Sequence, residues 1–148
     1  MKKKLRRLVV DGAPYLWSVG HLHFPRNEPP GHRCAERLTV YREGFRKAPA
    51  KLTFVATDGV LVGYPSSGVV VLERNETFNL HTPSLVARLI RGLEGWEPEH
   101  RSSPWMADDG IQRLRALVAC EGASKTDLAS DEDAPTDGSA PLRHTRRW

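Results

Sequence analysis

The sequence predicts an α+β domain: an antiparallel sheet of about five or six strands with one main helix packed on a face. Three observations support this fold class. Alternating apolar and polar residues come first in the chain, turns containing Gly or Pro separate them, and an amphipathic helix follows near residue 83. Because the strands precede the helices, repeated β–α–β units and a parallel sheet are not expected.

Short turn signals delimit the expected strands. Asp11-Gly12 and Asp58-Gly59 each predict a tight turn between two strands. Pro25–Arg33 contains two adjacent prolines and is expected to form a loop, since proline cannot donate to a ladder. The expected strands are residues 5–10, 14–24, 34–43, 51–57, 60–64 and 69–72, with a short edge strand at 105–107.

The clearest helix signal lies between Thr82 and Gly95. Thr82 is the expected N-cap, Pro83 suits the first helical position, and Gly95 is expected to end the helix. A shorter C-terminal helix is expected over Gly110–Ala119. The apolar residues that share one face of the first helix are Leu85, Val86, Leu89, Ile90 and Leu93.

Charge and composition divide the chain into three parts. Residues 1–7 hold five basic residues and no acidic one, and form a basic N-terminal arm. Residues 8–119 hold 13 basic and 12 acidic residues and are expected to form the single α+β domain. Residues 120–148 are rich in Ser, Asp, Ala, Pro and Gly, so we expect a disordered tail with little apolar surface to bury.

The sequence gives no membrane or export signal. No apolar run approaches the roughly 20 residues that span a bilayer. The basic N-terminus is followed by too few apolar residues for a signal peptide. We therefore expect a cytoplasmic protein with no membrane partner.

Two segments carry a resemblance. The first is VDGAPYLWSVGH (Val10–His21), and the second is NLHTPSLVARLIRGLEGWEP (Asn79–Pro98). Together they resemble a group of small bacterial proteins with a Trp-x-Val strand. In that group an Asn-Leu-x-x-Pro segment leads into a helix, and the helix ends in Gly-Trp. The resemblance spans roughly residues 6–117 and implies a shared fold. No reaction is assigned to that group, so the resemblance implies no catalytic residue.

His21 and His23 are the candidate metal ligands. They are two residues apart on an expected strand, so both project from one face. Two imidazoles on one face suit Zn²⁺ or another transition metal, and His32, Cys34 or His81 is available to complete the site. The alternative is a strand end that leaves the core and carries two harmless, partly solvated histidines.

Two further groups of residues suggest binding surfaces. The basic residues of the N-terminal arm favour weak, salt-sensitive contacts with nucleic acid phosphates. Trp17, Trp96 and Trp105 either close the core or form a patch for a protein partner. The turn from Gly63 to Gly68 contains two serines but lacks the spacing of a serine nucleophile. The basic residues of the arm are Lys2, Lys3, Lys4, Arg6 and Arg7.

No catalytic set is evident in the sequence, and no cofactor is expected. The composition and the aromatic residues favour a non-enzymatic protein-binding or regulatory module whose partner is another protein. The alternatives are a weak nucleic-acid binder that uses the basic arm and a metal-dependent enzyme centred on His21 and His23.

Overall fold

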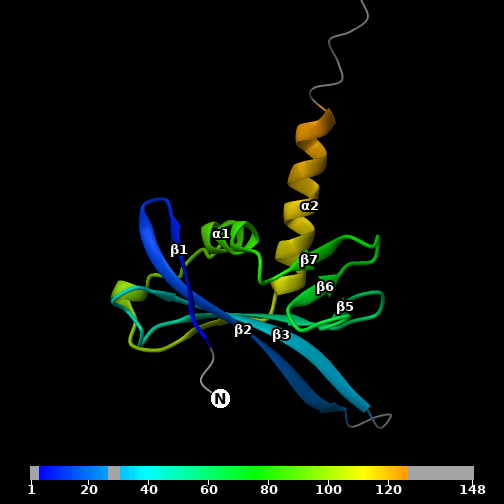
Figure 1. Ribbon diagram of the computed structural model, residues 1–148, viewed down its shortest axis with the longest axis horizontal. Coiled ribbons are helices and arrows are strands. Elements are labelled where there is room, and N and C mark those ends of the chain that lie inside the picture. The colour runs from blue at the N-terminus through cyan, green and yellow to red at the C-terminus, as the bar shows by residue number, and fades with distance from the viewer. Residues whose placement is uncertain (1–3, 27–30, 127–148) are drawn as a thin grey trace, which may run out of the picture.

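The computed structural model describes residues 4–26 and 31–126, which form two β-sheets and two α-helices (Figure 1). The larger sheet has five strands in the order β1-β2-β3-β4-β8, and the smaller sheet has three in the order β5-β6-β7. The fold is therefore α+β, as predicted, but the strands divide between two sheets. The strands of the larger sheet are β1 (Arg6–Val10), β2 (Ala13–Arg26), β3 (Gly31–Arg42), β4 (Ala50–Val55) and β8 (Trp105–Ala107).

The smaller sheet comes from the middle of the chain. It contains β5 (Leu61–Val62), β6 (Val69–Val71) and β7 (Thr77–Asn79). The turn at Asp58-Gly59 forms as predicted, since Thr57 and Val60 are bridged across it. The strand β7 was not expected from the sequence, because three residues with one apolar side chain give almost no alternation.

The β2–β3 hairpin is the longest pairing and projects beyond the helices in Figure 1. Its ladder continues to Arg26 opposite Gly31, so part of the predicted loop at Pro25–Arg33 is strand instead. The strand β1 pairs only with residues 13–17 of β2. Among the described residues, no strand pairs with that side of β2 beyond Trp17, and Pro25 is tolerated there.

The pairing is antiparallel except between β4 and β8, which are parallel. The strand β8 was expected as an edge strand, and it occupies the edge beside β4. Its direction follows from the long connection through α1 that returns the chain to the same sheet, because such connections suit parallel pairing.

Helix α1 spans Pro83–Arg91 and buries its apolar face as predicted. Two details differ from the sequence expectation. Thr82 makes no side-chain capping hydrogen bond, and the helix ends at Gly92. Gly95 instead adopts φ +74° in the turn beyond the helix.

Helix α2 spans Gly110–Thr126, so the C-terminal helix has 17 residues against nine in α1 and is longer than expected. It also extends into the segment predicted to be a disordered tail. Positions 127–148 lie outside the described residues. No helix in the described part of the chain is long and apolar enough to cross a bilayer.

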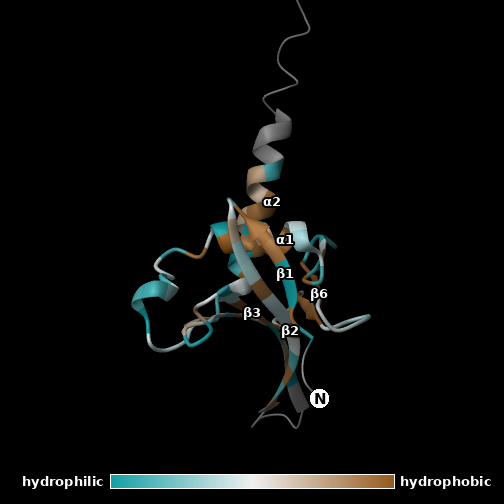
Figure 2. Ribbon diagram, turned by 60° about the vertical axis from the view of Figure 1, so that its left-hand side comes forward, coloured by the Kyte–Doolittle hydropathy of each residue, from teal (hydrophilic) through white to brown (hydrophobic). Residues whose placement is uncertain are grey.

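The core lies between the five-stranded sheet and the helices, where apolar residues of both layers meet (Figure 2). Helix α2 begins close against β4, because a Cβ on Gly110 would lie 2.6 Å from the Phe54 ring and from the Thr53 carbonyl oxygen. Trp96 follows α1 and donates its indole N–H to the Ala48 carbonyl at 2.9 Å. The core therefore reaches both ends of β4.

Candidate metal centre

The register of β2 against β3 places two cross-strand pairs side by side. His21 lies opposite Glu36, and His23 lies opposite Cys34. Residues opposite each other in an antiparallel ladder project to one face, and positions two apart along a strand share it. This single strand pairing therefore gathers four polar side chains on the face that carries Trp17 in the core.

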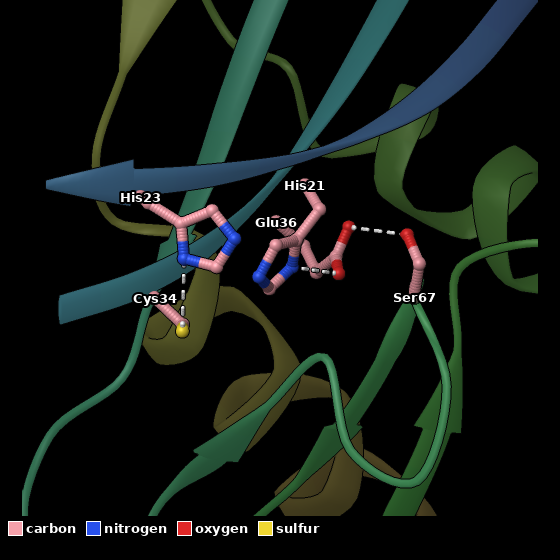
Figure 3. A network of polar contacts seen from close by, with 5 residues as sticks. All are labelled: His21, His23, Cys34, Glu36 and Ser67. Atoms are coloured by element: carbon pink, nitrogen blue, oxygen red, sulfur yellow. Dashed lines mark hydrogen bonds and ion pairs between the residues drawn. The ribbon is translucent and has the colours of Figure 1, made fainter. Parts of the chain in front are cut away.

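His21 and Glu36 form the buried half of this cluster. Their Nδ1 and Oε1 atoms are 2.7 Å apart, and the Glu36 side chain has 0% of its surface exposed against 24% for His21. Ser67, between β5 and β6, donates its hydroxyl to the other Glu36 oxygen at 3.4 Å (Figure 3). A buried carboxylate is costly unless it is paired and hydrogen-bonded, and these two contacts satisfy it.

The Glu36 contact also orients the His21 ring. A carboxylate that accepts from Nδ1–H leaves the lone pair on the other ring nitrogen, Nε2. Figure 3 shows this second nitrogen turned away from Glu36, toward His23 and Cys34. The arrangement matches the carboxylate–histidine pairs that support metal sites, in which the carboxylate fixes the tautomer and direction of a ligand.

Gly63 lets the smaller sheet close over this pair. A Cβ at position 63 would lie 2.4 Å from Cε1 of His21 and 3.1 Å from Oε1 of Glu36. The residue also has φ +76°, a backbone conformation that residues with a side chain rarely adopt. Glycine is therefore required here both by the backbone and by the imidazole beside it.

Cys34 and His23 form the more exposed half. The Cys34 Sγ atom lies 3.6 Å from Nδ1 of His23, and the His21 and His23 rings meet edge to face with centroids 4.4 Å apart. One donor atom from each of His21, His23 and Cys34 lies within 4.8 Å of the other two. Among the side chains that the structure describes, this is the one group of three potential ligands so close together.

These spacings fit a single tetrahedral metal ion. Zinc bonds of about 2.0–2.1 Å to nitrogen and 2.3 Å to sulfur place an N and an S ligand about 3.6 Å apart. The Cys34–His23 distance already equals this value. The His21 donor atom lies within 4.8 Å of the other two.

Of the three residues proposed to complete the site, the structure brings in Cys34. His81 lies elsewhere, with its ring against Gly68 and its backbone N–H bonded to the Asn79 side chain. The side chain of His32 lies outside the described residues. The structure thus places a thiol beside the histidine pair predicted from the sequence, and a buried carboxylate against His21.

The basic residues of β1 contact their own protein. Arg7 pairs with Glu43 at 2.9 Å. Arg6 donates to the His81 carbonyl at 2.9 Å and lies over the Trp17 ring. Lys4 is exposed, and Lys2 and Lys3 lie outside the described residues.

The three tryptophans do not share a surface patch. Trp17 and Trp96 are buried, at 1% and 9% exposure. Trp105 is half-buried, and the Arg113 guanidinium lies over its ring. The buried positions of Trp17 and Trp96 match the alternative in which these residues close the core.

Sequence reasoning missed Glu36, Gly63 and Ser67. Glu36 had a visible signal, because it lies two residues before Leu38 in the register of apolar, inward-facing positions of β3. A charged residue in such a register needs a buried partner. Gly63 and Ser67 had none, because their role depends on how the smaller sheet meets the larger one.

No family model, curated protein or solved structure matches this chain. The site is therefore described by its own geometry.

Proposed function

We propose that this protein binds one transition-metal ion, with Zn²⁺ as the best match, through His21, His23 and Cys34. The observation that carries the proposal is the convergence of two imidazoles and a thiol within 4.8 Å. The buried Glu36 behind His21 supports it, because a carboxylate in this position holds a ligand histidine in its binding tautomer.

The donor types narrow the choice of metal. Thiolate and imidazole ligands suit Zn²⁺ and copper, whereas Mg²⁺ and Ca²⁺ prefer oxygen ligands. A hydrogen-bonded polar cluster without a metal is the competing explanation. It accounts for the His21–Glu36 pair and for the hydrogen bond between Cys34 and His23. The metal site adds a reason for donor atoms of all three residues to converge within 4.8 Å.

The experiment that tests this proposal is metal analysis of the full chain. After loading with Zn²⁺ and removal of excess metal, we expect about one ion per chain. Cys34→Ser and the double variant His21→Ala/His23→Ala should each lose most of it. Thiolate ligation should also give Co²⁺-loaded protein a charge-transfer band that Cys34→Ser lacks.

Two matched controls separate the site from nonspecific binding. Cys120 is exposed on α2 and His100 is exposed in the short helix Pro98–His100. Cys120→Ser and His100→Ala should keep the metal. Equal metal content in the site variants and in these controls would contradict the proposal.

The other functions expected from the sequence stay predictions. No contact among the described residues identifies a protein partner. The ion pair and hydrogen bond made by Arg6 and Arg7 leave less of the arm available to nucleic acid. Neither alternative has a structural observation comparable to the donor cluster.

A further inference from the structure

A hollow of about 250 Å³ lies beside the donor cluster and shares Cys34 with it. Its walls come from the start of β3, the chain after β4, and β5. Val60, Leu61 and Val62 give it apolar surface, while Arg33 and Asp58 supply its charges. Cys34 thus belongs both to the donor cluster and to the wall of a space large enough for a small molecule.

The side chains that the structure describes, which do not include His32, provide three close donors and no fourth. Glu36 is not available as the fourth ligand, because its Oε1 atom is hydrogen-bonded to Nδ1 of His21. Nε2 of the same ring points away from Glu36 (Figure 3). Asp58 lines the hollow, but it does not belong to the close donor group. Sites with three protein ligands hold water or substrate in the fourth position, whereas structural zinc sites are closed by four.

We infer that the bound metal keeps one coordination position open to this hollow, where a small anion such as a carboxylate or hydroxamate replaces water. This inference rests on the proposed metal site and specifies what that site binds. The size of the hollow limits the ligand, because pockets for drug-sized molecules start at about 300 Å³. Arg33 gives the rim a cation, which favours a negatively charged ligand.

The chemical consequence is a centre of the catalytic kind. An open position on a zinc ion allows bound water to lose a proton near neutral pH, and allows a substrate oxygen to bind directly to the metal. Glu36 would then steady the metal through His21, while the hollow would admit the ligand. The two sides of the cluster thus have different roles.

The test uses the full chain loaded with Co²⁺, whose visible spectrum reports its ligands. Acetohydroxamate and acetate are the probes. Each should change the spectrum saturably, while the thiolate charge-transfer band remains. Arg33→Gln should weaken acetate binding about three- to ten-fold, and Arg46→Gln, on a distant loop, should leave it unchanged.

A second variant tests the hollow itself. Leu61 lines it and is 54% exposed, and Met106 on β8 is 56% exposed and lies elsewhere. Leu61→Trp should fill the hollow and weaken binding of both probes without altering the cobalt spectrum of the protein alone. Met106→Trp is the matched control and should bind both probes normally.

The outcomes separate this inference from the proposed function. Failure to bind Co²⁺ would overturn both. A thiolate-ligated cobalt spectrum that neither probe alters would overturn the open position alone. If the probes act only on Asp58→Asn or only on His32→Ala, then that residue is the fourth ligand, the site is closed, and the inference is wrong.

Discussion

Glu36 is a fully buried carboxylate in a strand whose neighbouring inward positions are apolar. The desolvation of such a group costs several kcal/mol, and breaking its pairing leaves a buried charge without compensation. An apolar residue would fill the same space without this desolvation cost. The contacts to His21 and Ser67 offset the cost, and the proposed metal site would give the carboxylate a role that an apolar residue lacks.

We expect Glu36→Gln to lower zinc affinity about 10- to 100-fold, the effect typical of losing a carboxylate that supports a ligand histidine. The amide keeps the size of the side chain but cannot hold the imidazole as a charged acceptor does. Competition with a chromophoric chelator measures the affinity. Glu43→Gln, on an exposed residue next to β3, should bind zinc normally, and an equal loss in both variants would argue against a specific role for Glu36.

Gly63 and Gly12 allow backbone strain to be separated from steric contact. Their φ angles are +76° and +78°, but a Cβ on Gly12 meets nothing within 4 Å, whereas one on Gly63 meets the His21 ring. Gly12→Ala should cost on the order of 1 kcal/mol and leave zinc binding intact. Gly63→Ala should cost more and also weaken zinc binding. Denaturant unfolding and zinc titration of both variants measure these effects. Equal stability and equal zinc affinity in the two variants would contradict the prediction.

At the residue scale, the sequence was informative about part of the site. His21 and His23 stand out because their spacing on a strand places both rings on one face. The choice among His32, Cys34 and His81 depended on the register of β2 against β3, and a shift of one residue would have changed the partner. Without the register, no rule of spacing could select Cys34.

At the element scale, an ion pair holds the end of helix α1 to the turn between β1 and β2. Arg91 donates to both oxygens of Asp11, at 3.1 to 3.3 Å. Asp11 has φ +49° in the β1–β2 turn. The hydrogen bonds from Arg91 lower the pKa of Asp11 below its ordinary value of 3.8.

The lowered pKa gives this pair a defined pH dependence. A carboxyl group whose pKa is lower in the folded state stabilises the fold above its unfolded pKa, and this contribution is lost as the pH falls through the folded value. Asp11→Asn should therefore melt slightly below wild type at pH 7, and the two should converge in strong acid. The effect should be small because both side chains are exposed. A difference that persists in strong acid would contradict this origin.

A second link between elements is buried. The indole N–H of Trp96, beyond α1, donates to the Ala48 carbonyl just before β4. Trp96→Phe should destabilise the fold by about 1 to 3 kcal/mol, since it leaves a buried acceptor unpaired and removes ring volume. Chemical denaturation measures this. Trp105→Phe, on a half-buried ring of β8, should cost less, and an equal loss would show that ring volume dominates.

The elements that the sequence predicted well are those with a strong local period. The apolar face of α1 and the alternation in β2 and β3 survive in the fold, because each is set by residues three, four or two apart. The division into two sheets could not be predicted in this way. It depends on β5, β6 and β7 pairing with one another, and all three strands have only two or three residues.

At the scale of the whole molecule, the proposed metal site lies where the two sheets meet. His21, His23 and Cys34 belong to the five-stranded sheet, and Gly63 and Ser67 come from the hairpin of the smaller sheet. The Glu36 carboxylate contacts His21 on one side and Ser67 on the other. A metal that fixes His21 therefore also restrains the contact between sheets.

Metal binding should accordingly stabilise the entire fold. A ligand that binds only the folded state adds about 2.7 kcal/mol at a free concentration of 100 times its Kd. For a protein of 148 residues, this corresponds to a rise in Tm of several degrees. Zinc should raise Tm by this amount, and a strong chelator should reverse the rise.

The variants show whether the effect comes from the site. Cys34→Ser and His23→Ala should melt close to the metal-free wild type, with or without zinc, because they keep the buried His21–Glu36–Ser67 contacts but lack a ligand. Cys120→Ser should respond as wild type does. A zinc-dependent rise that persists in Cys34→Ser and His23→Ala would place the ion elsewhere, because stabilisation by mass action requires the residues that bind it.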